Sequence, residues 1–373
     1  MNLSNKHLID NQELEALKKV LESGHLFRHR EEATECDSFE KEFSEFIGTS
    51  SSCLVNSGTN ALVAALRALD IKEGDEVIVP AYTFFATISS VLTVGATPVV
   101  VNIGSEFLLE LDSIKEAVTK KTKAIIPVHM DGRPCEIDKI CDFAKKENLF
   151  VIEDCAQALG ATYKGKRLGS FGDLGCFSFN MEKTITCGEG GAITTNDGAL
   201  GLKLKLVSDH AFGLNPKYKK MFEGMETILG SSMRVSELSG AMLRVQLKKV
   251  DSIIEENKKR KEILAKKLGT QIVEGECCST LYLRQDSLEN SVALTKKLLD
   301  KGITAMPMSM RLAHNIWQWK DYLSFNKIDY IETMEKLMGT VRIEIDNRKS
   351  LEQIEIDAEY IFGTRFLFRN SDT

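Results

Sequence analysis

Lys183 is the residue whose type and setting best suit covalent chemistry. It follows an apolar run at 176–180, which predicts a strand, and it precedes a glycine-rich turn at 188–191. A lysine amine that is desolvated in a pocket or lies near other cations has a lowered pKa and can act as a nucleophile that forms a Schiff base. Most of the 48 lysines and arginines must be ordinary solvated groups, so the position alone does not decide between these interpretations.

Two acidic residues, Glu153 and Asp154, end another apolar run that begins at residue 149. An acid in a buried crevice needs a cation, a metal or hydrogen-bond donors to stay ionised. No set of metal ligands accompanies this pair, so no metal is expected, and a protonated pyridine nitrogen is a fitting partner for Asp154. Strand alternation predicts that Glu153 faces the other side. Gln157 could donate to an oxygen of the same ring, although each of these residues would also suit a turn or a helix cap.

Ser57, Gly58 and Thr59 stand between an apolar run at 53–55 and an apolar helical pattern. Hydroxyl groups and free backbone N–H groups at a helix N-terminus favour an anion such as a phosphate. A plain helix cap is the alternative, and for this motif taken alone it is the better supported interpretation.

The elements that must position these residues indicate an α/β fold. Apolar runs that predict buried strands alternate with helical patterns, which is typical of a mainly parallel sheet covered by helices on both faces. These runs lie at 53–55, 75–79, 97–101, 123–128 and 149–153. Ligands of such sheets bind beyond the carboxyl ends of the strands, so the candidate residues are expected to meet there.

The second half of the chain predicts a smaller domain. A charged helical pattern at 234–269 is expected to bridge a large domain at 1–248 and a small C-terminal domain at 249–373. The small domain is expected to have strands near 279–284 and 341–346 and helices near 289–301 and 350–361.

Composition argues against several classes of partner. A formal charge of −6 gives no general attraction to nucleic acid or to an anionic membrane. No stretch approaches the roughly 18–20 apolar residues of a membrane span. The nine cysteines are scattered and lack metal-binding spacing, which predicts reduced thiols. Together with a polar N-terminal region, these features predict a cytoplasmic protein.

These residues and runs resemble the DegT/DnrJ/EryC1/StrS family of sugar aminotransferases, which depend on pyridoxal 5′-phosphate. The resemblance covers roughly residues 10–265, and its matching runs lie at 56–62, 74–80, 83–87, 95–98, 128–132, 153–158, 163–166, 172–179 and 188–191. It implies fold type I of the pyridoxal-phosphate-dependent transferases. That fold has a large domain with a mainly parallel seven-stranded sheet between helices and a small C-terminal α+β domain.

The resemblance also implies a role for each matching residue. Lys183 would bind the cofactor as a Schiff base and carry a proton during the reaction, and Asp154 would pair with the pyridine nitrogen. Phe84 would stack on the ring, and Gln157 would contact the ring hydroxyl. The phosphate would be held by Ser57, Gly58, Thr59 and Ser178.

The chain departs from the family pattern at one cofactor contact. A Gly-x-Asn-x-Arg run, whose asparagine reaches the phosphate in the partner subunit, reads Gly-Ser-Ser-Met-Arg at 230–234, so the shorter Ser232 takes that position. Arg234, Glu237 and Gln246 still match, so a homodimer with a shared active site is expected. The C-terminal region carries no convincing family pattern, so the resemblance does not predict which sugar is the acceptor.

The implied function is ping-pong amino transfer. An amino acid, with L-glutamate as the expected donor, would convert the cofactor to pyridoxamine 5′-phosphate, which would then aminate a keto or aldehyde sugar for polysaccharide biosynthesis. The sugar is expected to be nucleotide-linked or an acidic sugar of the octulosonate type. The runs at 27–30, 128–132, 183–191 and 208–210 resemble family members that act on the latter.

Two other functions fit the same scaffold. A sugar dehydratase that uses this cofactor would have histidine in place of Lys183, and a non-catalytic regulator would be expected to lose Lys183 or Asp154, so the sequence favours amino transfer. Arg28, His129 and His210 are candidates for contacts with the acceptor. The alternatives are a surface arginine and hydrogen-bonded structural histidines.

Overall fold

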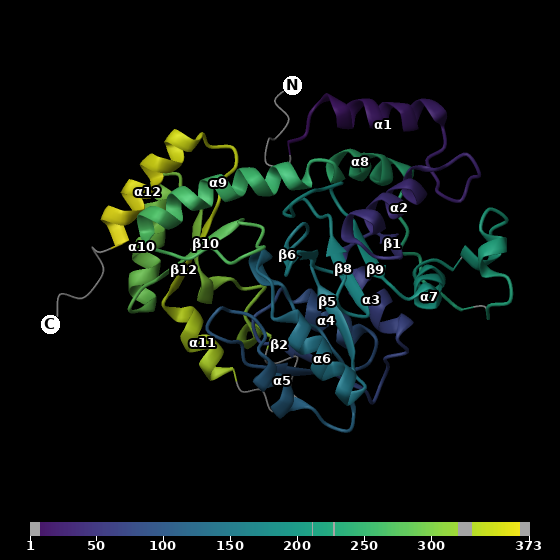
Figure 1. The fold of residues 1–373 in the computed structure, drawn as a ribbon, viewed down its shortest axis with the longest axis horizontal. Coiled ribbons are helices and arrows are strands. Elements are labelled where there is room, and N and C mark those ends of the chain that lie inside the picture. Colours follow the sequence, from purple (N-terminus) through teal and green to yellow (C-terminus); the bar gives the residue numbers. More distant parts are fainter. Residues whose placement is uncertain (1–7, 211, 227, 320–329, 366–373) are drawn as a thin grey trace.

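Seven strands form the central sheet, in the order β1-β9-β8-β5-β4-β2-β3 (Figure 1). The structure is a computed structural model that describes residues 8–210, 212–226, 228–319 and 330–365. The seven strands are β1 (Ser51–Val55), β2 (Glu76–Pro80), β3 (Thr97–Val101), β4 (Thr122–Ile125), β5 (Phe150–Asp154), β8 (Leu174–Ser178) and β9 (Gly191–Thr195). Neighbouring strands from β3 to β8 are parallel, whereas β9 is antiparallel to both β8 and β1. The predicted mainly parallel seven-stranded sheet is confirmed.

Helices cover both faces of this sheet. They are α2 (Glu35–Ile47), α3 (Gly58–Ala68), α4 (Ala86–Thr93), α5 (Leu111–Ala117), α6 (Ile137–Glu147) and α7 (Gly198–Ser208), whereas α1 (Asn11–Ser23) packs against the later helix α8 (Glu237–Leu247). Because successive strand residues point to opposite faces, each strand contributes to two cores. In β1, Leu54 packs in the core that α2 and α6 cover, whereas Cys53 and Val55 pack in the core that α3 and α4 cover.

The predicted long helix at 234–269 is two helices. α8 (Glu237–Leu247) and α9 (Val250–Leu268) are separated at residues 248–249 and follow one another along one edge of the molecule (Figure 1). Val250 packs in the core of the large sheet, whereas Leu264 packs in the core of the small domain. The helix α9 therefore contributes to both cores, as expected for a helix that bridges two domains. The domain boundary at 248/249 stays a prediction.

The C-terminal part is built on a three-stranded antiparallel sheet in the order β10-β12-β11. Its elements are β10 (Thr280–Arg284), α10 (Leu288–Asp300), β11 (Ala305–Pro307), α11 (Ile331–Met338), β12 (Thr340–Glu344) and α12 (Leu351–Arg365). The strands and helices that were expected here are present. Three features were not predicted from the sequence, namely β11, α11 and the hairpin of β6 (Thr162–Tyr163) and β7 (Lys166–Arg167) in the large part.

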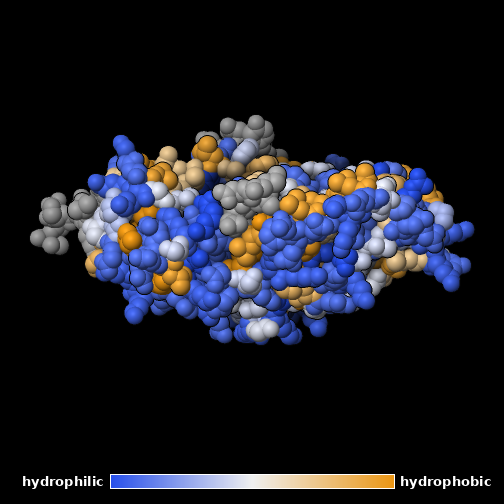
Figure 2. Space-filling model, turned by 90° about the horizontal axis from the view of Figure 1, so that it is seen from above, coloured by the Kyte–Doolittle hydropathy of each residue, from blue (hydrophilic) through white to orange (hydrophobic). Residues whose placement is uncertain are grey.

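The face of the molecule drawn in Figure 2 is mainly hydrophilic, with hydrophobic residues in separate groups. Within the described ranges, no helix is both long and apolar enough to cross a membrane. Residues 1–7, which are part of the N-terminal region predicted to be polar, lie outside the described residues.

Candidate active site

A cavity of about 630 Å³ lies where the carboxyl ends of β5 and β8 meet the N-terminus of α3. Parallel α/β sheets bind ligands at this edge. Eight residues predicted to hold or use the cofactor line the cavity together, and these are Ser57, Gly58, Thr59, Phe84, Asp154, Gln157, Ser178 and Lys183. The ninth, Ser232, does not.

Lys183 lies in the turn after β8, where its backbone N–H donates to the carbonyl of Asn180 at 3.0 Å. Its Nζ lies 5.9 Å from the centroid of the Phe84 ring. Burial lowers the pKa of the Lys183 amine, the nearby carboxylate of Asp154 opposes this, and the Arg311 guanidinium lowers the pKa further. An amine with a lowered pKa is more often unprotonated and therefore more nucleophilic.

Asp154 ends β5 with its carboxylate facing the cavity, and the side chain is 5% exposed. Its Oδ2 accepts a hydrogen bond from Thr87 Oγ1 at 2.8 Å, and its Oδ1 accepts one from the N–H of Ala156 at 3.1 Å. Burial raises the pKa of Asp154 because these two neutral donors do not replace the lost water. A buried carboxylate with this environment fits a cationic ring nitrogen in the cavity.

Glu153 points away from the cavity, as the alternation of the strand predicts. Its carboxylate is fully buried and accepts backbone N–H groups of Gly169, Phe171 and Gly172 at 2.8–2.9 Å. Glu153 thus holds the loop before β8 in place, and it does not line the cavity.

The residues predicted to hold a phosphate surround the start of α3. Ser57 caps the helix, because its Oγ accepts the N–H of Asn60 at 3.1 Å, so the alternative of a helix cap is confirmed for this residue. Gly58 and Thr59 line the cavity, and N–H groups in the first helical turn have no acceptor within the helix. A Cβ at Gly58 would lie 2.8 Å from the Cβ of Ser178, so only glycine allows this close approach. These groups fit an anion such as a phosphate.

Gln157 is oriented by Asp131, whose backbone N–H donates to Gln157 Oε1 at 3.1 Å. The same amide can donate through its nitrogen to an oxygen in the cavity. Asp131 has a φ of 52° and belongs to the short helix η2 (Met130–Gly132). Aspartate tolerates this left-handed region better than most residues.

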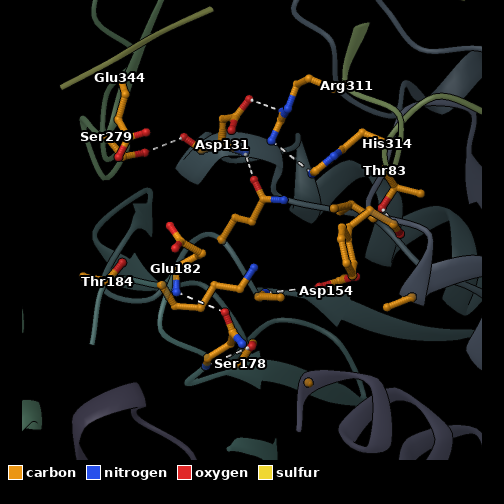
Figure 3. A pocket seen from close by; sticks show the side chains of 18 of the residues that line it. Thr83, Asp131, Asp154, Ser178, Glu182, Thr184, Ser279, Arg311, His314 and Glu344 are labelled. Atoms are coloured by element: carbon orange, nitrogen blue, oxygen red, sulfur yellow. Dashed lines mark hydrogen bonds and ion pairs between the residues drawn. The ribbon is translucent and has the colours of Figure 1, made fainter. Parts of the chain in front are cut away.

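Several polar and charged residues on the side of the cavity opposite Ser178 were not predicted from the sequence. Figure 3 shows Asp131, Arg311 and His314 there, and Arg342 of β12 also lines the cavity. Asp131 lies in the family-like run at 128–132, which was a usable signal. No pattern singled out the other three, since they are far from Asp131 in the sequence and belong to the region without a family pattern.

The structure does not place the three predicted acceptor contacts in the cavity. Arg28 is 0% exposed, and its guanidinium pairs with Asp37 at 3.0 Å and with Glu40 at 3.1 Å. It is thus neither a surface arginine nor a cavity residue. His129 is 0% exposed, and His210 is exposed but does not line the cavity.

His129 fits the structural alternative. Its Nδ1 accepts the N–H of Cys135 at 3.1 Å, so the ring proton lies on Nε2, which is 3.2 Å from Glu153 Oε2. Ligand atoms of His129, Glu153 and Cys155 lie within 4.8 Å of one another, which is a spacing a metal could use. Since the Glu153 oxygens and both ring nitrogens are already in protein hydrogen bonds, we interpret this cluster as a buried hydrogen-bond network.

Ser232 lies outside the cavity lining of its own chain. It is exposed, and its backbone forms a bridge with Asp209. The contact predicted for this residue is with a partner subunit, so its role in holding a phosphate stays a prediction.

Comparison with known proteins places this geometry in one family. The family model described as "DegT/DnrJ/EryC1/StrS aminotransferase family" matches residues 7–340. GDP-perosamine synthase of Caulobacter vibrioides is 44% identical over 214 residues, which are 57% of this chain and 56% of that protein. dTDP-3-amino-3,6-dideoxy-alpha-D-galactopyranose transaminase of Aneurinibacillus thermoaerophilus is 41% identical over 253 residues, 67% of this chain and 66% of that protein. The chain thus aligns with less than two thirds of the length of these relatives.

Solved structures agree along almost the whole chain. The aminotransferase from Psychrobacter cryohalolentis superposes with a TM-score of 0.85 at 29% identity, covering 97% of this chain and 98% of that chain. Other structures with this fold are described as holding PLP or its PMP form. The fold expected from the sequence, type I of the pyridoxal-phosphate-dependent transferases, is confirmed.

Proposed function

Because the chain belongs to the DegT/DnrJ/EryC1/StrS aminotransferase family, we propose that it is a sugar aminotransferase that depends on pyridoxal 5′-phosphate. It moves an amino group from an amino acid, with L-glutamate as the expected donor, to a keto or aldehyde sugar. The observation that carries this proposal is one cavity that holds Lys183, whose pKa is lowered, together with buried Asp154 and the start of α3.

The cofactor and the residues of the cavity would have different roles in the reaction. When bound, pyridoxal phosphate supplies an aldehyde and an electron-withdrawing ring that can spread out a negative charge. Ser178 and the backbone N–H groups of Gly58 and Thr59 would hold its phosphate. Asp154, which accepts a hydrogen bond from Thr87, would pair with the ring nitrogen and keep it protonated. Phe84 would pack against the ring, and Lys183 Nζ would hold the cofactor and would carry the proton of the substrate carbon.

The presence of Lys183 favours amino transfer over the alternatives. A dehydratase of this scaffold would lack the lysine, and a regulator without catalysis would have no need for an amine with a lowered pKa in the cavity. The chain keeps both the amine and the buried acid, so amino transfer is the function that these residues support best.

The protein is proposed to act as a homodimer with a shared active site. Ser232 is exposed, and it would reach the phosphate of the partner subunit. A large domain at 1–248 and a small domain at 249–373 remain our proposed division of the chain.

A visible absorption spectrum of the purified protein, with pyridoxal phosphate supplied and before and after addition of L-glutamate, tests the function. We expect a band of the lysine-bound cofactor that L-glutamate removes and that a keto or aldehyde sugar then restores. The variant Lys183→Ala should keep its circular dichroism spectrum and lose both the band and amino transfer. A wild-type band that no amino acid changes would contradict amino transfer, and turnover by the lysine variant would contradict the role of Lys183.

A further inference from the structure

Ser232 lies on a short extended segment at 231–233 whose direction is fixed by its own chain. Backbone hydrogen bonds of 2.8–3.0 Å join the N–H groups of Ser231 and Met233 to the carbonyls of residues 207–208. The Met233 side chain packs in the core that α3 and α4 cover. Because successive residues of an extended segment point to opposite sides, Ser232 is directed away from that core, and it is exposed.

Asp209 lies opposite Ser232 on the neighbouring segment, where the two residues form an antiparallel bridge. The carboxylate of Asp209 is buried and has a partner at each oxygen. Its Oδ2 lies 2.6 Å from His29 Nε2, and its Oδ1 accepts a hydrogen bond from Arg234 Nη1 at 3.1 Å. A buried carboxylate needs such partners to stay ionised. The position of Asp209, and with it that of the bridge to Ser232, therefore depends on these two side chains.

The ring of His29 is enclosed by aromatic side chains and makes one polar contact among the described residues. Its centroid lies 5.0 Å from the ring of Phe27, 5.2 Å from that of Phe212 and 5.6 Å from that of Tyr218. Its Nδ1 is buried and has no hydrogen-bond partner in this part of the chain. Because an ionised carboxylate only accepts, His29 Nε2 donates to Asp209. A buried ring nitrogen without a partner is costly, so this hydrogen bond is what favours histidine over an apolar ring here.

The backbone at residues 28–29 is itself anchored to the large part of the chain. The Tyr218 hydroxyl donates to the Arg28 carbonyl at 3.1 Å, and Asn215 Nδ2 donates to the His29 carbonyl at 3.2 Å. The buried guanidinium of Arg28 pairs with two acids of α2. His29 is therefore a fixed point, and its hydrogen bond can hold Asp209 in one position.

We propose that His29 is a positioning residue that acts through Asp209 to direct Ser232 at the cofactor phosphate of the partner subunit. This inference rests on the proposed function, since it requires the homodimer in which Ser232 reaches that phosphate. The serine is shorter than the asparagine of the family pattern. A short side chain can compensate little for a displaced backbone, and a hydrogen bond weakens steeply when its geometry is poor. The contact made by Ser232 therefore needs a backbone that is held in place from outside the segment.

The test compares variants of His29 that lose or keep the donor to Asp209. His29→Leu and His29→Asn remove this donor, and the asparagine variant carries the test if the leucine variant does not fold. His29→Gln can place an amide donor where Nε2 lies. In all three variants Asp209 keeps Arg234 as a partner, so its buried charge stays paired. His25→Leu is the matched control, because the His25 side chain is 39% exposed and its Nδ1 lies 4.0 Å from Glu32, beyond hydrogen-bonding distance.

The measurement is the dissociation constant of pyridoxal phosphate, obtained by fluorescence titration without amino acid on protein that analytical ultracentrifugation shows to be dimeric. We expect His29→Leu to weaken cofactor binding by about tenfold, as for the loss of a hydrogen bond to a charged group. His29→Gln should restore most of the affinity, and His25→Leu should bind the cofactor as the wild type does. In combination with Ser232→Ala, His29→Leu should cause little further loss, because the contact that it positions is already absent.

Equal cofactor affinity in the two donor-free His29 variants and in His25→Leu would overturn the inference. A lower urea-unfolding midpoint with that equal affinity would show a structural role alone. Losses from His29→Leu and Ser232→Ala that multiply in the double variant would also overturn it, because His29 would then act by another route. Coupled losses in a protein whose cofactor band L-glutamate leaves unchanged would contradict the proposed amino transfer and leave the role of His29 in place. A protein that stays monomeric would contradict the homodimer and this inference together.

Discussion

Replacing Thr87 by valine removes one hydrogen-bond donor from Asp154 and leaves the volume of the side chain almost unchanged. Thr87 is 0% exposed and lies on α4, where its hydroxyl is 2.8 Å from Asp154 Oδ2. This hydrogen bond stabilises the charged carboxylate, whose pKa is already raised by burial. Its loss must therefore raise the pKa of Asp154 further, because the charged form loses a partner and the neutral form loses less.

The size of the effect follows from the strength of the bond. A hydrogen bond to a charged group contributes about 1.5–3 kcal/mol. One pKa unit corresponds to about 1.4 kcal/mol, so the pKa of Asp154 in the cofactor-free protein should rise by about one to two units. Since the cationic ring nitrogen needs an ionised Asp154, pyridoxal phosphate should bind more weakly as the pH falls, and this loss should begin at a higher pH in the variant.

The assay is the dissociation constant of pyridoxal phosphate measured across a pH series with wild-type protein and three variants. Thr87→Val should move the acidic midpoint up by about one to two pH units. Thr87→Ser keeps the hydroxyl and should restore most of the wild-type curve. Thr93→Val is the matched control, because the Thr93 hydroxyl on the same helix donates to the Ser89 carbonyl at 2.7 Å and is exposed. An acidic midpoint in Thr87→Val that equals that of wild type would refute the reasoning that Thr87 tunes Asp154.

Two further predictions concern the phosphate end of the site. Gly58→Ala places a Cβ 2.8 Å from the Cβ of Ser178, so α3 or β8 must shift, and the affinity for pyridoxal phosphate should fall by about tenfold or more. Gly48→Ala is the control, because its Cβ meets open space. Since Gly48 has a φ of 83°, this variant should lower the stability of the fold and leave the cofactor affinity unchanged. Fluorescence titration of the cofactor and urea unfolding separate these two effects, and equal cofactor affinity in Gly58→Ala and wild type would contradict the close packing. Ser232→Asn should keep or increase cofactor affinity if this position reaches the phosphate of a partner subunit, and the change should disappear in protein diluted to monomers as monitored by analytical ultracentrifugation. A disrupted dimer would instead indicate that Ser232 packs at a tight interface.

The part of the site that follows strand ends could be predicted from the sequence. Asp154 ends one strand, Ser57 follows closely after another, and Lys183 follows shortly after β8. Because parallel strands end at one edge of a sheet, local patterns and one topological rule are enough to bring such residues together. The period of a strand is two residues, so the sequence also predicts that Asp154 and Glu153 lie on opposite sides of β5.

The arrangement of the opposite wall depended on long-range packing. Asp131, Arg311 and Arg342 are far apart in the sequence and contact one another only because the small sheet packs against the large one. The burial of Arg28 could not be predicted from the sequence for the same reason. Its partners Asp37 and Glu40 lie on α2, and a run of polar residues does not show that a guanidinium within it is buried. Local sequence determined the strands, the turns and the groups at their ends, since these depend on near neighbours. Tertiary structure alone decided which distant charges were desolvated together, because an ion pair inside a protein forms only where packing has already excluded water.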